Sequence, residues 1–183
     1  LVERYAGATL VSRGAPFSTL VRSIVGQQIS VKAADRVWAR VSAALPELVP
    51  DAVLTLSVEE LRACGLSARK VEYIVDLAAH FVAGRIRVDA WPSMEDAAII
   101  AELTDVRGIG EWTAQMFLIF NLLRPDVLPL DDIGLQKAVA TLYFADQRPS
   151  RRQLAELGER WRPWRSVATW YLWRSLDPVP VEY

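Results

Sequence analysis

The chain of 183 residues is poor in the side chains that build metal and redox centres. It contains one cysteine, Cys64, and one histidine, His80. A single cysteine excludes an internal disulfide and a four-cysteine zinc or iron–sulfur site. Any Ser–His–Asp chemistry would have to use His80, but this residue lies in an apolar stretch with helical spacing. The pattern therefore favours a structural histidine.

An excess of one charge and long apolar runs are also lacking. The chain has 21 basic and 22 acidic residues and a net charge of −1, so any binding to DNA must rest on local clusters. No apolar run approaches the ~18–20 residues that span a bilayer, and no signal peptide is visible. We expect a cytoplasmic, intracellular protein with no membrane partner. The chain begins at Leu1 rather than Met, which leaves open what precedes it.

Apolar residues are abundant, at 52 %, and recur at helical spacing. No convincing series of alternating strands interrupts them, so the fold class is predicted to be all-α. Pro46 and Pro50 are expected to break the pattern, and residues 85–92 to form a connection. Ser30, Ser67, Ser93 and Asp132 are expected as N-caps. Helices are predicted over 16–25, 30–45, 58–63, 67–81, 93–103, 111–123 and 132–143, with a final helical region from Pro149.

Two glycines two residues apart mark a tight hairpin between helical patterns. Gly108 and Gly110 allow backbone angles closed to other residues and let another backbone approach closely. The helix that follows would present free amide groups, which attract a phosphate. A corner that merely packs is the alternative. The full string, Leu103-x-x-Val106-x-Gly108-Ile109-Gly110-x-x-Thr113-Ala114, resembles the helix-hairpin-helix motif of DNA repair enzymes.

Two further motifs extend this resemblance. They are Ile24-Val-Gly-Gln-Gln-Ile-Ser-Val-Lys-Ala-Ala34 and Leu128-Pro-Leu-Asp-Asp-Ile-Gly-Leu135. In this order the three motifs resemble the AlkA-type 3-methyladenine DNA glycosylases, from about Pro16 to Trp173. The resemblance implies one glycosylase domain over 1–183, built as two helical lobes with the active-site cleft between them. The chain lacks room for the N-terminal β-rich domain of the larger members and is similar to a compact form.

The resemblance implies that Asp132 is the catalytic carboxylate. In the family this aspartate is followed by an aliphatic-Gly-aliphatic triplet, which Ile133-Gly134-Leu135 matches. Asp131 is the alternative, because adjacent residues at a helix start point about 100° apart and only one can face a nucleotide. Both can also be capping carboxylates, which is compatible with catalysis. A carboxylate in a dry site stabilises the oxocarbenium-like charge of glycosidic cleavage.

Three residues are expected to bind the displaced base. Trp112 stands where bifunctional relatives carry a nucleophilic lysine, so no Schiff base and no AP lyase activity are expected. The resemblance implies that Trp112 and Trp173 line the pocket, where an indole would attract a cationic base by ~0.5–2 kcal/mol. A core tryptophan is the alternative for Trp112. Met116 replaces a pocket tyrosine of larger members. The other tryptophans nearby are expected to pack: Trp161, Trp164 and Trp170.

The resemblance also implies a set of DNA contacts. Gln28 takes the position of the side chain that fills the gap left by a flipped base, with Gln27 beside it; a buried glutamine at a helix end is the alternative. Ser67 to Lys70, and a cluster of Arg148, Arg151 and Arg152, are weaker candidates. The hairpin contacts are expected from Gly108, Gly110, Glu111 and Thr113. The carbonyls of Thr104, Val106 and Ile109 are expected to bind Na⁺ or K⁺ as a bridge to phosphate, outside the chemistry.

Together these features predict a monofunctional glycosylase of the DNA-3-methyladenine glycosylase II type. It would flip alkylated purines, of the 3-methyladenine and 7-methylguanine kind, out of duplex DNA and hydrolyse the N-glycosidic bond in base excision repair. It would act as a monomer with no cofactor for the chemistry. The alternatives are a glycosylase for deaminated, etheno or oxidised bases and a non-catalytic DNA-binding relative. A purely structural helical domain is disfavoured by the three ordered motifs.

Overall fold

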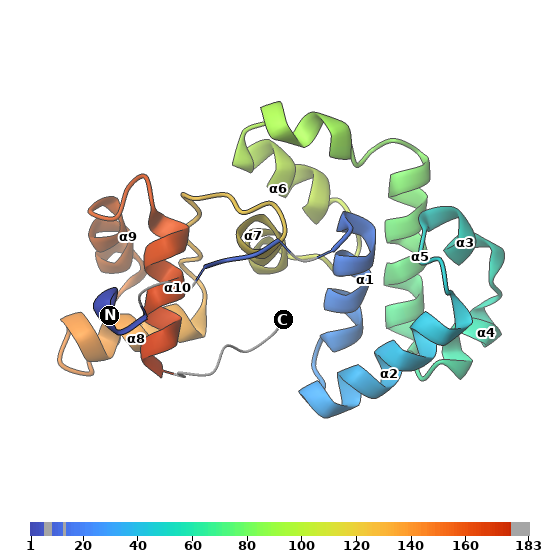
Figure 1. Cartoon of the computed structure of the whole chain (residues 1–183), viewed down its shortest axis with the longest axis horizontal. Helices are drawn as coiled ribbons and strands as arrows, with labels where there is room; N and C mark the ends of the chain where they lie inside the picture. The colour runs from blue at the N-terminus through green and yellow to red at the C-terminus, as the bar shows by residue number, and fades with distance from the viewer. Residues whose placement is uncertain (6–8, 13, 177–183) are drawn as a thin grey trace. The chain divides into compact units, whose positions relative to one another are not determined.

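The computed structural model describes residues 1–5, 9–12 and 14–176, and the regular elements in these ranges are all helices (Figure 1). The all-α prediction is therefore confirmed for the described chain. Contacts divide the chain into two compact units. We call Arg13–Ala114 the hairpin unit, and Leu1–Ser12 with Gln115–Glu182 the carboxylate unit. The two units agree with the two predicted lobes, whereas the cleft between lobes stays a prediction.

The hairpin unit is organised around α5 (Ala68–Val82). Helices α1 (Pro16–Gly26), α3 (Pro50–Thr55) and α4 (Val58–Ala63) pack against α5, and α2 (Val31–Ala44) packs against α1 (Figure 1). The unit continues with the 3-10 helix η2 (Val88–Ser93), α6 (Asp96–Thr104) and the hairpin that follows, as far as Ala114. Serine hydroxyls cap α2, α4 and α5. The predicted apolar face of α1 is buried, as its spacing requires: Phe17, Leu20, Val21, Ile24 and Val25.

Two expectations about this unit were wrong, and the predicted connection over 85–92 needs one refinement. Pro50 does not break a helix but begins α3, because proline at the first helical position loses no hydrogen bond. The connection over 85–92 contains most of η2. Ser93 does not cap α6, since its Oγ donates to the carbonyl of Ala90 at 2.9 Å and α6 begins after Glu95. Ser93 lies two residues before the N-cap position, which Glu95 occupies, so its hydroxyl is not placed to accept from the first turn of α6.

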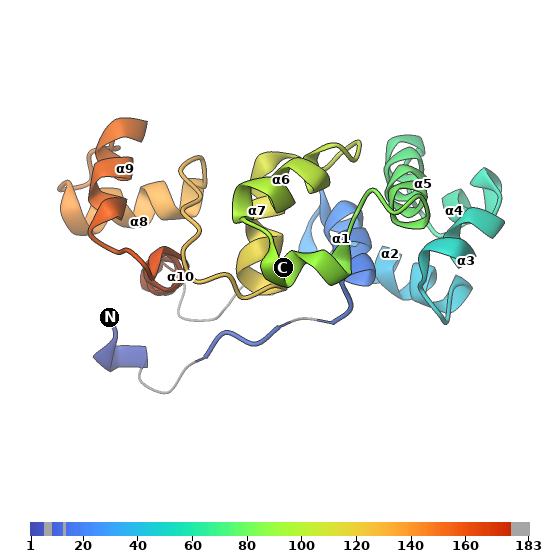
Figure 2. The same ribbon diagram turned by 90° about the horizontal axis from the view of Figure 1, so that it is seen from above.

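The carboxylate unit contains the C-terminal part of α7 (Glu111–Phe120), then α8 (Ile133–Tyr143), α9 (Arg151–Glu159) and α10 (Arg165–Leu176) (Figure 2). The predicted final helical region is thus two helices. Helix α7 ends before the predicted Leu123, whose φ of +54° is incompatible with a continuing helix. Of the three tryptophans expected to pack, Trp170 is buried and Trp161 lies on the core, but Trp164 is exposed. The core of this unit comprises Leu135, Ala138, Val139, Leu154 and Leu172.

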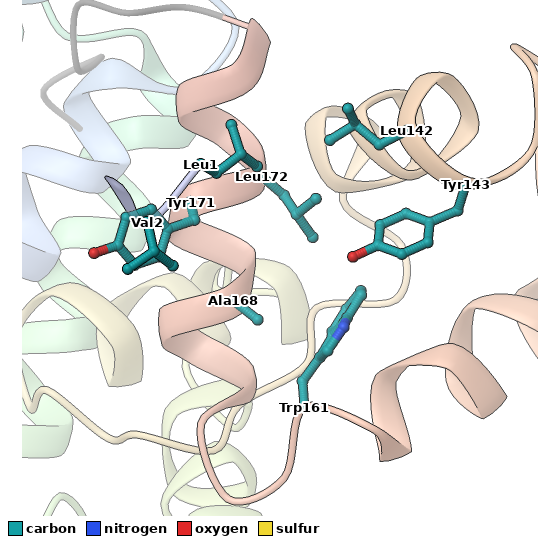
Figure 3. Close-up of a pocket in the computed structure, with 8 residues that line it drawn as sticks. All are labelled: Leu1, Val2, Leu142, Tyr143, Trp161, Ala168, Tyr171 and Leu172. Carbon is teal, nitrogen blue, oxygen red and sulfur yellow. The ribbon is translucent and has the colours of Figure 1, made fainter. Parts of the chain in front are cut away.

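The short 3-10 helix η1 (Glu3–Tyr5) attaches the start of the chain to α10. Tyr5 Oη donates to the carbonyl of Arg174 at 2.8 Å, and the Arg174 guanidinium lies 5.6 Å from the Tyr5 ring centroid. Leu1, Val2 and Tyr171 are among the residues that line an apolar pocket (Figure 3). The pocket also includes Leu142, Tyr143, Trp161, Ala168 and Leu172. In the described ranges no helix combines the length and apolar character that a bilayer crossing needs.

An ion pair fixes the start of α10 to the loop after α7. Arg165 donates to both carboxylate oxygens of Asp126, with Nε–Oδ1 at 2.7 Å and Nη2–Oδ2 at 2.9 Å. Burial alone would raise the pKa of Asp126, but the hydrogen bonds from Arg165 and the charges of Arg165 and Arg162 outweigh burial, so this pKa lies below its ordinary value. Two parallel bonds also give the pair a fixed geometry.

We expect Arg165→Met to lower the free energy of unfolding by about 2 kcal/mol at pH 7. The folded-state pKa of Asp126 is depressed, so the contribution of the pair is present above the unfolded pKa of about 3.9 and is lost as pH falls. Urea unfolding of wild type and variant between pH 7 and pH 3 checks this. A stability difference that stays constant down to pH 3 would contradict it.

Candidate functional site

Asp132 is a buried carboxylate at the N-terminus of α8. Its side chain is 7 % exposed, and Oδ1 accepts two hydrogen bonds, from the Leu135 amide at 2.6 Å and from Trp173 Nε1 at 2.7 Å. The predicted N-cap is therefore confirmed. The partial positive charge of a helix N-terminus favours an anion at this position. The arrangement holds a carboxylate in one orientation inside the carboxylate unit.

The neighbouring Asp131 has a different setting. Its side chain is 68 % exposed, and both carboxylate oxygens accept from Arg151 Nη1, at 2.8 and 2.9 Å. Asp131 is thus part of a surface ion pair. Of the two adjacent aspartates, only Asp132 has the burial and the fixed hydrogen bonds that suit electrostatic stabilisation of a developing charge.

Trp173 connects Asp132 to two other helices. Its indole stacks on Phe120 with ring centroids 5.7 Å apart and an interplanar angle of 18°. Gly134 leaves room for this arrangement, because a Cβ there would lie 3.1 Å from Trp173 Cδ1 and 3.2 Å from Asp132 Oδ1. The sequence marked Gly134 only as part of a family triplet. It missed Phe120, although this aromatic lies four residues after Met116 on the predicted helix.

The other two predicted base-binding residues differ in exposure. Met116 is buried, at 7 % exposed, and belongs to the carboxylate unit. Trp112 belongs to the hairpin unit and is 38 % exposed, so the alternative of a core tryptophan is wrong. An indole with this exposure has a surface to offer a base. The base-binding roles of Trp112, Met116 and Trp173 stay predictions.

The two hairpin glycines have different structural settings. Gly108 has φ +84°, and a Cβ at this position would collide with the Tyr73 ring. Gly110 does not have a positive φ angle, and a Cβ there would meet nothing within 4 Å. The requirement for a special backbone angle is therefore confirmed for Gly108 and wrong for Gly110. The open space at Gly110 lies beside the first turn of α7, where Glu111 is exposed and Thr113 is half-buried.

The hairpin loop is held by side chains from elsewhere in its unit. Asp76 Oδ2 accepts from the Arg107 amide at 2.8 Å, and Gln27 Nε2 donates to the Gly108 carbonyl at 2.8 Å. His80 is buried, with Nδ1 2.8 Å from the Asp76 carbonyl oxygen and Nε2 3.1 Å from Asp105 Oδ2. A structural role for His80 is thus confirmed. The sequence missed Asp76 and Tyr73, whose only signal was polar residues recurring at helical spacing.

We call residues Gln27–Ser30, between α1 and α2, the wedge turn. Gln28 is exposed with φ +57°, so the alternative of a buried glutamine is wrong for this residue. Lys70 Nζ donates to the Val25 carbonyl at 2.8 Å, and burial lowers the pKa of Lys70. This ammonium binds the C-terminal end of α1, where a cation is favourable. Lys70, a candidate for binding phosphate, is thus already bonded within the protein.

The remaining basic candidates also have partners within the carboxylate unit. Arg148 donates to Gln136, Arg151 to Asp131, and Arg152 to Glu156. The two ion pairs among them, Arg151–Asp131 and Arg152–Glu156, are on the surface, where ion pairs contribute little to stability. Among the residues that the structure describes, no group of three or more His, Cys, Asp or Glu side chains could hold a metal ion. At the hairpin, the Val106 carbonyl accepts from the Ile109 amide at 3.1 Å, which leaves a second lone pair for a cation.

The sequence is similar to known DNA repair proteins. Residues 21–163 match the model of the HhH-GPD superfamily of base excision DNA repair proteins. The chain is 31 % identical to DNA-3-methyladenine glycosylase 1 of Schizosaccharomyces pombe over 96 % of this chain and 78 % of that protein. It is 32 % identical to YfjP of Bacillus subtilis over 97 % of this chain, and it spans 64 % of the length of YfjP.

Solved structures agree with these matches. A DNA-3-methyladenine glycosidase from Bacillus halodurans superposes with a TM-score of 0.88 at 37 % identity, covering 93 % of this chain and 79 % of that one. The Schizosaccharomyces pombe 3-methyladenine DNA glycosylase in complex with abasic DNA superposes with a TM-score of 0.79 at 29 % identity, covering 97 % and 89 %. The second of these proteins was thus solved bound to DNA.

The two hairpin glycines provide a matched test of structure. Gly108→Ala should lower the free energy of unfolding by about 2–4 kcal/mol, because it adds left-handed strain and a collision with Tyr73. Gly110→Ala should change it by less than about 1 kcal/mol, since the new methyl group meets nothing. Thermal or urea unfolding of both variants measures the difference. Equal losses would show that the two positions are equivalent, contrary to this geometry.

Proposed function

The chain belongs to the HhH-GPD superfamily of base excision DNA repair proteins, and from this premise we propose that it is a monofunctional DNA glycosylase for alkylated purines. The main support for this proposal is Asp132, a buried carboxylate whose Oδ1 accepts hydrogen bonds from Leu135 and Trp173. The names of the relatives from Schizosaccharomyces pombe and Bacillus halodurans support 3-methyladenine as the lesion class. Bases of the 7-methylguanine type carry the same positive charge and are proposed as substrates too.

Asp132 stabilises the charge that develops when the glycosidic bond breaks. The bond between the sugar carbon and the base nitrogen cleaves, its electron pair leaves with the base, and positive charge remains on the sugar. A fixed carboxylate in a buried setting lowers the energy of this cation without reorganising. Water then attacks the sugar carbon and loses a proton, which leaves an abasic site. An alkylated purine is already cationic and leaves as a neutral base, so no strong general acid is needed.

The choice of aromatic residues supports a cationic base and argues against strand cleavage. Trp112 and Trp173 present indole rings, whose electron-rich faces attract a cation. A tryptophan cannot form a Schiff base, so position 112 offers no route to AP lyase chemistry. Met116, which belongs to the carboxylate unit as Trp173 does, offers a flexible apolar side chain to the base. The product is an intact strand that carries an abasic site.

The hairpin and the wedge turn are proposed to bind damaged duplex DNA. The open space at Gly110 would admit a phosphate to the first turn of α7, and Gln28 would fill the gap left by the flipped base. The carbonyls of Thr104, Val106 and Ile109 would bind Na⁺ or K⁺ between the hairpin and a phosphate. We further propose that the enzyme acts as a monomer on intracellular DNA, in a cytoplasm of the bacterial type.

The two adjacent aspartates allow a matched test of catalysis. Asp132→Asn should slow release of 3-methyladenine or 7-methylguanine from duplex DNA by at least about 100-fold, because the charge is lost while the amide oxygen still accepts from Leu135 and Trp173. Asp131→Asn should retain activity within about threefold, since it loses only a surface ion pair. Single-turnover release of the labelled base, alongside DNA affinity, is the measurement.

Activity retained in Asp132→Asn and lost in Asp131→Asn would reverse the assignment. No release by wild type would redirect the assay to duplexes with deaminated, etheno or oxidised bases. Release from one of these alone would make the protein a glycosylase of different specificity. No release from any of them would make it a non-catalytic DNA-binding relative.

Gly110→Ala tests the phosphate site without disturbing the fold. The added methyl group lies in open space within the chain, but it would stand where a phosphate approaches the amides. Duplex affinity should fall by about tenfold, corresponding to ~1.4 kcal/mol, and the salt dependence of binding should become shallower. Fluorescence anisotropy with an abasic duplex at several salt concentrations measures both. Wild-type affinity and slope in the variant would remove Gly110 from the interface.

A further inference from the structure

The wedge turn and the hairpin are joined by one direct hydrogen bond. Gln27 Nε2, in the wedge turn, donates to the carbonyl oxygen of Gly108 at 2.8 Å, across 81 residues of sequence. Gly108 is the glycine with the left-handed backbone angle, so the bond fixes the carbonyl at the bend of the hairpin. The contact is partly buried, which protects it from competition by water. One amide hydrogen of the Gln27 side chain is therefore bonded within the protein.

A single face of α5 supports both ends of this bond. Lys70 binds the Val25 carbonyl just before the wedge turn, and the Tyr73 ring packs against Gly108. Asp76 accepts from the Arg107 amide, and His80 contacts Asp105 at the start of the hairpin. These four α5 residues lie within an arc of about 120° around the helix axis. One helix face thus positions two turns that are far apart in sequence.

We propose that Gln27 is a positioning residue that couples the wedge turn to the hairpin, so that phosphate binding and displacement of the base occur as one event. The proposal rests on the function proposed above. In duplex DNA the distance between a phosphate and the base step beside it is set by the helix, and a binding site must match it within about 0.5 Å. Two independently mobile turns would meet this requirement less often. The bond from Gln27 holds Gln28 and the amides after Gly108 at a fixed separation.

Hydrogen exchange in the absence of DNA tests the link itself. Gln27→Met keeps the length of the side chain but cannot donate, so exchange of the Arg107 and Ile109 amides should accelerate by about fivefold to tenfold. Gln27→Lys retains an N–H donor and should restore most of the protection. Gln28→Met, in the same turn, should leave these two amides unchanged. Wild-type exchange in Gln27→Met, or failure of Gln27→Lys to restore protection, would overturn the proposal.

Duplex binding then tests the coupling. Gln27→Met and Gly110→Ala should each weaken binding to an abasic duplex by about tenfold, and the double variant by little more than either alone, because both act on one hairpin contact. Flipping, followed by the fluorescence of a 2-aminopurine beside the lesion, should decline in the same proportion as binding in Gln27→Met. Losses that multiply to about 100-fold would mean that Gln27 acts independently of the hairpin, which would overturn the coupling.

The two tests keep the inference distinct from the proposed function. If wild type neither binds nor flips duplex DNA, the proposed function fails, while the exchange experiment still reports whether Gln27 holds the hairpin. If wild type releases alkylated bases and the exchange at Arg107 and Ile109 is unaffected by Gln27→Met, only the positioning role fails. If Gln27→Met accelerates exchange, and the double variant binds little more weakly than either single variant, both the positioning role and the coupling are supported.

Discussion

The pair of hydrogen bonds to Asp132 Oδ1 constrains most of the carboxylate unit. A buried carboxylate is strongly destabilising unless charge-assisted bonds and a helix N-terminus compensate for lost hydration. Leu135 supplies one bond from α8 itself, and Trp173 supplies the other from α10. Gly134 leaves room for the indole, since a Cβ there would lie 3.1 Å from Trp173 Cδ1, and the indole stacks on Phe120 of α7. Residues of α8 and α10 therefore meet at this one oxygen atom, and α7 contacts the indole that donates to it. In the proposed reaction this carboxylate charge would stabilise the sugar cation.

The hairpin unit follows the same rule at its loops. A turn that must offer its backbone to a ligand cannot be stabilised by regular hydrogen bonding, so side chains from a rigid element have to hold it. Helix α5 performs this task with the polar residues on one face, and Gln27 extends the support to the wedge turn. Gly110 remains open while Gly108 is tightly packed on Tyr73. The fold therefore requires glycine at position 108, whereas the open space at Gly110 is available to the proposed phosphate.

Local sequence was informative wherever the interaction spans one turn of helix. Ser30 bonds the amide of Ala33, and Asp132 bonds that of Leu135, so residue type and spacing predicted both caps. The buried face of α1 followed from its period. Errors arose where a residue had two local solutions. Pro50 begins a helix instead of ending one, and Ser93 does not cap α6 because that helix begins after Glu95. Trp164 was expected to pack but is exposed, because an aromatic residue near a proline carries no sign of which side faces the core.

By itself the sequence determined the all-α class, the family and the hairpin, and it favoured Asp132 over Asp131 only through a family triplet, because motifs and helix caps are encoded within a few consecutive residues. Only the tertiary structure separated buried Asp132 from Asp131 paired on the surface, and assigned Lys70 to the end of α1. It also brought Trp173 to Asp132 across 41 residues and Gln27 to Gly108 across 81. Such pairings depend on how helices pack, and the energy of packing is spread over many apolar contacts that no short pattern records.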